Sequence, residues 1–207
     1  YAPGAVHAPH HVPKEWIAAG RVQVIAPVGF ADAALSENVM AGNAMIRRAT
    51  YMYGPLLPNG PKGAVSPGLG LGIPFAASTF IVPNVEITDD VQSMTIDGVE
   101  FTFMLAPDTE APAEMLFHLP QLRALCSAED ATHVLHNLYT LRGARTRDAK
   151  AWAYYLDKAI DLFGEDSDVV FAQHHWPTWG RERVREFLED HRDAYKFLHD
   201  QVLRLAN

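Results

Sequence analysis

The chain has 207 residues, of which 48% are hydrophobic and 20% charged, a composition typical of a globular protein with one large domain or two small ones. Its 17 Lys and Arg against 25 Asp and Glu give a net charge of -8 without any basic block, which argues against nucleic acid or an anionic membrane surface as a partner. No apolar stretch is long enough to predict a membrane span, and the single cysteine, Cys126, excludes an internal disulfide and a thiolate metal cluster.

The first half of the chain predicts a strand, a helix, a long loop and a hairpin, in that order. Residues 21–26 are rich in β-branched side chains and predict a strand, and residues 31–52 place apolar residues among good helix formers and predict a helix. Residues 54–74 are rich in Gly and Pro, and a loop of this length is often functional. Farther on, the pair Asp97-Gly98 between two alternating apolar runs predicts a tight β-hairpin.

The second half predicts a helix, a buried strand and a final helical segment. Residues 148–163 carry apolar side chains at helical spacing, with Asp148 as the N-cap and Gly164 as the C-cap. Residues 168–172 predict a strand, and residues 183–205 predict one amphipathic helix or two. The chain therefore predicts an α/β fold, in which functional residues are expected at the carboxyl ends of strands.

Two glutamates and one of two adjacent histidines are candidate metal ligands. His174 and His175 directly follow the predicted strand, while Glu110 lies in a loop stiffened by prolines and Glu129 follows a short apolar run. One imidazole and two carboxylates form a ligand set that suits Zn²⁺ or another divalent ion. The alternatives are that the two histidines bond only to backbone carbonyl groups and that the two glutamates are solvated surface charges.

Two further groups of residues admit two interpretations each. His133 and His136 lie three residues apart, so on a helix they would share one face and could bind a metal or take a structural role. Arg142, Arg145 and Arg147 form the tightest basic cluster and could bind carboxylate, phosphate or sulfate, or could form a solvated loop. The chain has no GxSxG, no phosphate-binding glycine loop and no CxxC, which argues against serine, P-loop and dithiol chemistry.

Five strings of the chain follow one another in a specific order: AGNAMIRRATYMYG, TEAPAEM, CSAEDATHVLHNLYTLRGARTRD, HHWPTWG and RDAYKFLHDQVLRLAN. Together they closely resemble the zinc-dependent alkyl sulfatases of the metallo-β-lactamase superfamily. The resemblance implies hydrolysis of alkyl sulfate esters such as dodecyl sulfate to an alcohol and sulfate, by water that two zinc ions activate. It also implies an αββα sandwich of the metallo-β-lactamase type.

The resemblance implies a role for five residues. Glu110 of the TEAPAE string would hold one zinc ion, Glu129 would bridge both ions, and His174 would hold the other ion. Arg142 of the LRG string would bind the sulfate group, with Arg147 as a further candidate. The family also implies a periplasmic or secreted location and a homodimer of the full-length protein.

One motif of the family is missing from the sequence. The HxHxDH string, which supplies further zinc ligands in the family, is expected across or before Tyr1, and His7, His10 and His11 have the wrong spacing to replace it. We therefore expect residues 1–207 to form one portion of a catalytic domain, without the N-terminal metal motif and the C-terminal domains. The alternative is a folded piece of such an enzyme that binds little metal and has no activity.

Overall fold

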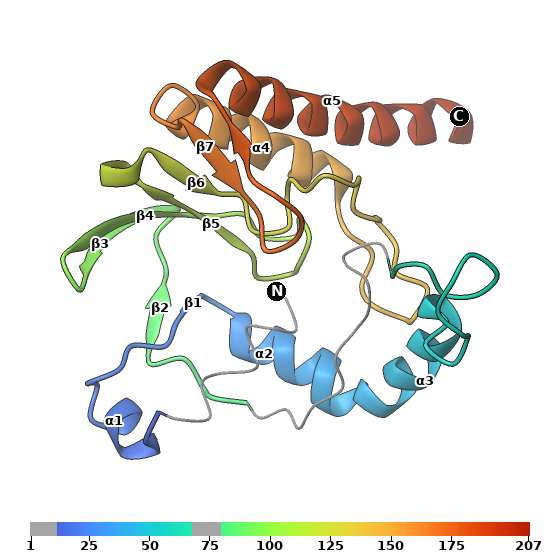
Figure 1. Cartoon of the computed structure of the whole chain (residues 1–207), viewed down its shortest axis with the longest axis horizontal. Coiled ribbons are helices and arrows are strands. Elements are labelled where there is room, and N and C mark those ends of the chain that lie inside the picture. The colour runs from blue at the N-terminus through green and yellow to red at the C-terminus, as the bar shows by residue number, and fades with distance from the viewer. Residues whose placement is uncertain (1–11, 68–79) are drawn as a thin grey trace.

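The computed structural model describes residues 12–67 and 80–207, and within them it shows a mixed α/β fold built on one main sheet (Figure 1). The sheet has six strands in the order β3-β4-β5-β6-β7-β8, and every neighbouring pair is antiparallel except β6 and β7, which are parallel. The strands are β3 (Val91–Ile96), β4 (Val99–Leu105), β5 (Met115–Leu119), β6 (Ala124–Cys126), β7 (Val169–Phe171) and β8 (Thr178–Trp179).

The predicted hairpin joins β3 to β4. Asp97 and Gly98 have φ angles of 50° and 80°, and Ile96 pairs with Val99 across the turn. Two consecutive positive φ angles are the mark of a type I′ turn, whose twist matches that of the strands it connects. The sequence prediction of a hairpin at this position is confirmed.

Two long helices cover one side of the sheet, as Figure 1 shows, and with the sheet they enclose the main core. They are α4 (Ala149–Phe163) and α5 (Arg181–Ala206), so the last helical segment is one helix. The side chain of Asp148 accepts hydrogen bonds from the N–H groups of Lys150 and Ala151 and so caps α4 as predicted. The fully buried core side chains include Met104, Leu116, Leu125, Trp152, Leu156, Val170, Val184, Leu188 and Tyr195.

The N-terminal part forms a smaller layer on the other side of the sheet in Figure 1. It contains α1 (Lys14–Ala18), β1 (Ile25–Pro27), α2 (Phe30–Leu35), the π-helical turn η2 (Ser36–Met40) and α3 (Gly42–Tyr53). A separate 3₁₀ turn, η3 (Pro120–Leu122), follows β5 in the main sheet. Strand β1 pairs in parallel with β2 (Val85–Ile87). None of the helices in residues 12–67 and 80–207 is both long and apolar enough to cross a bilayer.

The single helix predicted for residues 31–52 is interrupted. The amide of Asn38 donates to the carbonyl of Ala34 at 3.1 Å, so a side chain competes for a group that a regular helix would use. The helix widens into a π turn there and restarts at Gly42, a residue with low helix propensity. The strand predicted for residues 21–26 is also shorter and later, because only Ile25, Ala26 and Pro27 pair with β2.

Candidate metal centre

The candidate ligands lie on loops that meet at one edge of the main sheet. Glu129 follows β6 and His174 follows β7, and because these strands are parallel neighbours their carboxyl ends lie at the same edge. Two backbone hydrogen bonds tie the loops together, from Ser127 N–H to Phe171 O at 2.9 Å and from Gln173 N–H to Ala128 O at 3.2 Å. This pairing brings Glu129 and His174 together although 45 residues separate them in sequence.

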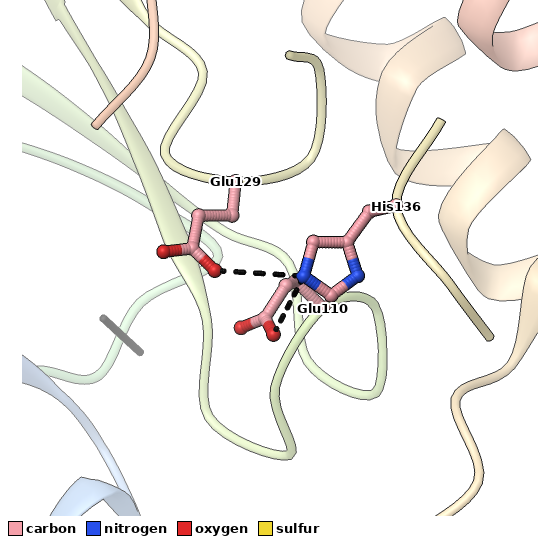
Figure 2. Close-up of side chains that lie close together, drawn as sticks. All are labelled: Glu110, Glu129 and His136. Atoms are coloured by element: carbon pink, nitrogen blue, oxygen red, sulfur yellow. Dashed lines mark ion pairs between the residues drawn. The ribbon is translucent and has the colours of Figure 1, made fainter. Parts of the chain in front are cut away.

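A cluster of three buried groups forms at this edge, as Figure 2 shows. One ligand atom from each of Glu110, Glu129 and His136 lies within 4.8 Å of the others. The Nε2 atom of His136 is 3.6 Å from Oε1 of Glu110 and 3.8 Å from Oε2 of Glu129, both too long for hydrogen bonds. The other oxygen of Glu129, Oε1, is 2.7 Å from Nε2 of His174.

The hydrogen bonding of His136 determines which of its two ring nitrogens carries the proton and which has a free lone pair. Its Nδ1 is 3.1 Å from the carbonyl oxygen of Asn137, and because a carbonyl only accepts, Nδ1 carries the proton. Burial lowers the pKa of His136 and outweighs the opposing effect of Glu110, so the ring is neutral near neutral pH. The lone pair of Nε2 is therefore directed at two carboxylate oxygens.

Three electron-pair donors that face one point are suited to a cation. Ligand atoms around a tetrahedral Zn²⁺ are about 3.4 Å apart, given metal–ligand distances near 2.1 Å. The two contacts of His136, at 3.6 and 3.8 Å, are close to that spacing. The residues present therefore fit a divalent ion that accepts nitrogen and oxygen ligands, and the mixed set disfavours Mg²⁺ and Ca²⁺, which take oxygen ligands.

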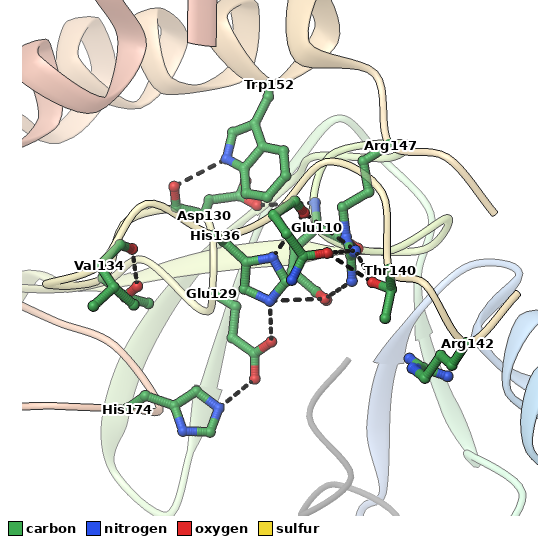
Figure 3. A network of polar contacts seen from close by, with 12 residues as sticks. Glu110, Glu129, Asp130, Val134, His136, Thr140, Arg142, Arg147, Trp152 and His174 are labelled. Atoms are coloured by element: carbon green, nitrogen blue, oxygen red, sulfur yellow. Dashed lines mark hydrogen bonds and ion pairs between the residues drawn. The ribbon is translucent and has the colours of Figure 1, made fainter. Parts of the chain in front are cut away.

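Arg147 is buried beside this cluster and forms an ion pair with Glu110 (Figure 3). Its guanidinium also donates to the main-chain carbonyl of Glu110, to Oγ1 of Thr140 at 2.7 Å and to the side chain and carbonyl of Asn137 at 3.3 Å. Burial alone would raise the pKa of Glu110, but nearby positive charge, including that of Arg147, lowers it overall. Burial and then the charge of Glu110 raise the pKa of Glu129.

Arg142 lies apart from the cluster in Figure 3. Its Nη1 forms an ion pair with Oε1 of Glu37 at 2.6 Å and lies 3.9 Å from Sδ of Met45, so its described partners come from η2 and α3. The structure thus places Glu110, Glu129, His174 and Arg147 together and Arg142 farther away. Their roles as metal ligands and sulfate-binding residues stay predictions.

The sequence alone leaves His136 undecided, because its spacing from His133 suggests a helical pair. The segment is an irregular loop, and the two rings point to different places. His133 stacks on Trp176, with ring centroids 4.6 Å apart, and shares a 3.1 Å hydrogen bond with Thr178. The sequence could not reveal the different positions of the two rings, since the loop has no hydrophobic periodicity. His7, His10 and His11 lie outside the described residues.

Several known proteins that are similar to this chain are named as sulfatases. No family model matches the chain. It is 51% identical over 191 residues to the alkyl/aryl-sulfatase BDS1 of Saccharomyces cerevisiae, 50% identical to a linear primary-alkylsulfatase of a Pseudomonas species and 44% identical to an (R)-specific secondary-alkylsulfatase of a Pseudomonas species. Each match covers 92% of this chain but only 28–30% of the relative's length.

Solved structures agree with this similarity. The stereoselective inverting sec-alkylsulfatase Pisa1 from Pseudomonas sp. matches with a TM-score of 0.92 and 43% identity, over 95% of this chain and 31% of that chain. A metallo-β-lactamase family protein from Thermus thermophilus matches with a TM-score of 0.55 and 17% identity over 97% of this chain and 62% of that one, which shows the fold alone. The predicted resemblance and fold class are confirmed: the chain is similar over 92% of its length to proteins named as alkylsulfatases, and it has a metallo-β-lactamase-like α/β fold. It spans about 30% of the length of the curated relatives it matches.

Proposed function

We propose that this chain is a portion of the catalytic domain of an enzyme that hydrolyses alkyl sulfate esters to an alcohol and sulfate. The observation that carries the proposal is the convergence of Glu110, Glu129 and His136, with His174 on the second oxygen of Glu129. Relatives named as alkylsulfatases, at 44–51% identity, support the substrate class. Two zinc ions in a complete site would supply activated water and positive charge at the sulfate group.

Glu129 has the geometry of a carboxylate that two ions could share. Its Oε2 faces His136 and its Oε1 faces His174, so its two oxygens are directed to different histidines. Glu110 contributes to the His136 side, where Arg147 holds its carboxylate and main chain. In this proposal the protein orients ligands mainly through buried contacts, and Arg147 acts as the residue that fixes Glu110.

Arg142 is the proposed sulfate-binding residue. Its guanidinium is already paired with the carboxylate of Glu37, and both side chains are about one-fifth exposed. A planar fork that can bind a carboxylate can equally bind two sulfate oxygens. An alkyl sulfate would then compete with Glu37 for Arg142, while the acidic net charge of the chain is locally offset by the guanidinium and by bound metal.

The metal centre is tested by zinc uptake of the 207-residue chain after dialysis. We expect Glu129→Gln to weaken zinc binding at least 10-fold, as the loss of a ligand usually does. Glu86→Gln is the matched control, because Glu86 is exposed on β2, and it should bind zinc like the wild type. Less than two zinc ions per chain are expected, since the sequence lacks the HxHxDH string.

The sulfatase activity is tested by sulfate release from dodecyl sulfate. In a complete version of the domain, Arg142→Ala should lower turnover by about 10- to 100-fold and leave zinc content unchanged, because a charge-assisted hydrogen bond contributes about 1.5–3 kcal/mol. Arg145→Ala is the control, as the Arg145 side chain is 73% exposed. A chain that takes up no zinc, or equal zinc uptake by Glu129→Gln and the wild type, would contradict the metal centre and favour a metal-poor, non-catalytic piece.

A further inference from the structure

The loop that carries Glu129 and His136 has no regular secondary structure, and its first part is buried. Residues 127–132 are all buried, and no helix or strand is assigned between Cys126 and Ala149. Buried carbonyl groups in such a segment lack the ladder partners of a sheet or helix and need donors from elsewhere. The donors to this loop therefore determine its conformation.

Side chains of the two long helices contact three of these carbonyl groups, and two of the side chains are unambiguous donors. The indole Nε1–H of Trp152 on α4 donates to the carbonyl of Asp130 at 2.9 Å, and the hydroxyl of Tyr195 on α5 donates to the carbonyl of His136 at 3.2 Å. Nε2 of His191, also on α5, lies 2.7 Å from the carbonyl oxygen of Thr132. The helices thus hold the loop at three successive points.

Trp152 and Tyr195 form one rigid unit. Both side chains are 0% exposed, and their rings stack with centroids 4.1 Å apart and an interplanar angle of 17°. A stacked, fully buried pair has few alternative rotamers, so its two polar hydrogens are fixed relative to each other. The two carbonyl groups that accept them are fixed to the same extent.

The two anchored carbonyl groups are adjacent to the candidate ligands. Asp130 directly follows Glu129, and its side chain accepts a 3.3 Å hydrogen bond from the N–H of Glu110. The other anchored carbonyl belongs to His136 itself, whose ring lies 5.9 Å from the ring of Trp152. Figure 3 shows Trp152 above Asp130, with Glu129, His136 and Glu110 grouped below it.

We propose that the stacked pair of Trp152 and Tyr195 is a positioning device that sets the metal affinity of the centre by fixing the main chain at Asp130 and His136. This inference rests on the proposed metal-dependent function and deepens it. Residues that orient ligands from behind commonly change metal affinity by about 10- to 100-fold. A purely structural core role would instead lower stability and leave the affinity of the folded protein unchanged.

The test is Tyr195→Phe, which removes one hydroxyl and keeps the stacked ring. Tyr154→Phe is the matched control, since Tyr154 is 61% exposed on α4. The dissociation constant for Zn²⁺ is measured by competition with a chromophoric chelator, at a temperature at which circular dichroism shows every variant to be folded. We expect Tyr195→Phe to bind Zn²⁺ about 10-fold more weakly than the wild type and Tyr154→Phe to bind it equally.

Amide hydrogen exchange of residues 128–137 in the metal-free chain provides a second readout. Tyr195→Phe should speed exchange there, because the carbonyl of His136 loses its donor, and Tyr154→Phe should not. Trp152→Phe is the second variant: it removes the donor to Asp130, but it also removes part of a fully buried ring, so its affinity is compared with the wild type only at a temperature at which it is folded. Wild-type affinity in a folded Tyr195→Phe variant would overturn the inference, whether or not its exchange is faster.

The two proposals fail in different ways. If the wild-type chain binds no Zn²⁺, the proposed metal function is contradicted and the effect on metal affinity falls with it, whereas the exchange measurement still tests whether the stacked pair fixes the main chain. If the wild type binds Zn²⁺ and folded Tyr195→Phe binds it equally, only the positioning role is overturned.

Discussion

Replacing Arg147 with methionine is expected to lower the free energy of unfolding of the metal-free chain by about 3–5 kcal/mol, the usual effect of removing one partner of a buried ion pair. The Arg147 and Glu110 side chains are 8% and 5% exposed, so solvent would compensate little of the lost charge. Methionine retains much of the aliphatic volume, which limits any cavity contribution. The hydrogen bonds to Thr140 and Asn137 are lost as well.

The assay is urea unfolding followed by circular dichroism, with the slope against urea concentration checked for constancy. Adding Glu110→Gln to Arg147→Met should recover part of the stability, because the double variant no longer buries that carboxylate. Arg145→Met is the control, since Arg145 is 73% exposed and lies 3.6 Å from Asp108, and it should cost less than about 1 kcal/mol. A cost for Arg147→Met as small as that of Arg145→Met would refute the reasoning.

Three further predictions concern residues outside the centre. Burial raises the pKa of Cys126 to about 11, so in the folded chain at pH 8 its thiol should react with a disulfide reagent at least 10-fold more slowly than in urea, and equal rates would contradict this. Burial lowers the pKa of His118, so as pH falls below about 6.5 this imidazole takes up a proton more readily in the unfolded chain than in the folded chain. The free energy of unfolding should therefore fall from pH 7 to pH 5 more for the wild type than for His118→Phe. Urea unfolding at both pH values measures this, and equal losses would count against it. Asp148→Ala removes the cap of α4 and should cost about 1 kcal/mol in the same assay, whereas an unchanged midpoint would show that the cap is dispensable.

The elements predicted correctly from the sequence have signals that are local. The turn at Asp97-Gly98 needs two residues that accept positive φ, and α4 has its cap and its apolar spacing within the helix itself. The break at η2 depends on Asn38 bonding to a carbonyl within the helix, which propensity alone did not reveal. Local patterns therefore predicted the type of each element better than its continuity.

The candidate centre was predictable in part for a related reason. Strand ends and shared strings predict Glu110, Glu129 and His174 as ligands, and the structure brings these residues together, while their role as ligands stays a prediction. The sequence leaves the role of His136 open, since its place in the cluster depends on a loop held by contacts from distant helices. The pairing of Arg142 with Glu37 was likewise not foreseen, because nothing in sequence links η2 to that loop.

The parallel pairing of β6 with β7 governs the order in which the cluster can assemble. Parallel neighbours cannot be joined by a tight turn, so the whole of α4 lies between β6 and β7 in the chain. Ala124 can therefore pair with Val169 only after the segment that contains α4 has been made. Glu110, Glu129 and His136 all precede α4 in the chain, whereas His174 follows it. In a nascent chain emerging from the ribosome, the first three residues are available well before His174, which reaches Glu129 only when the crossover has folded.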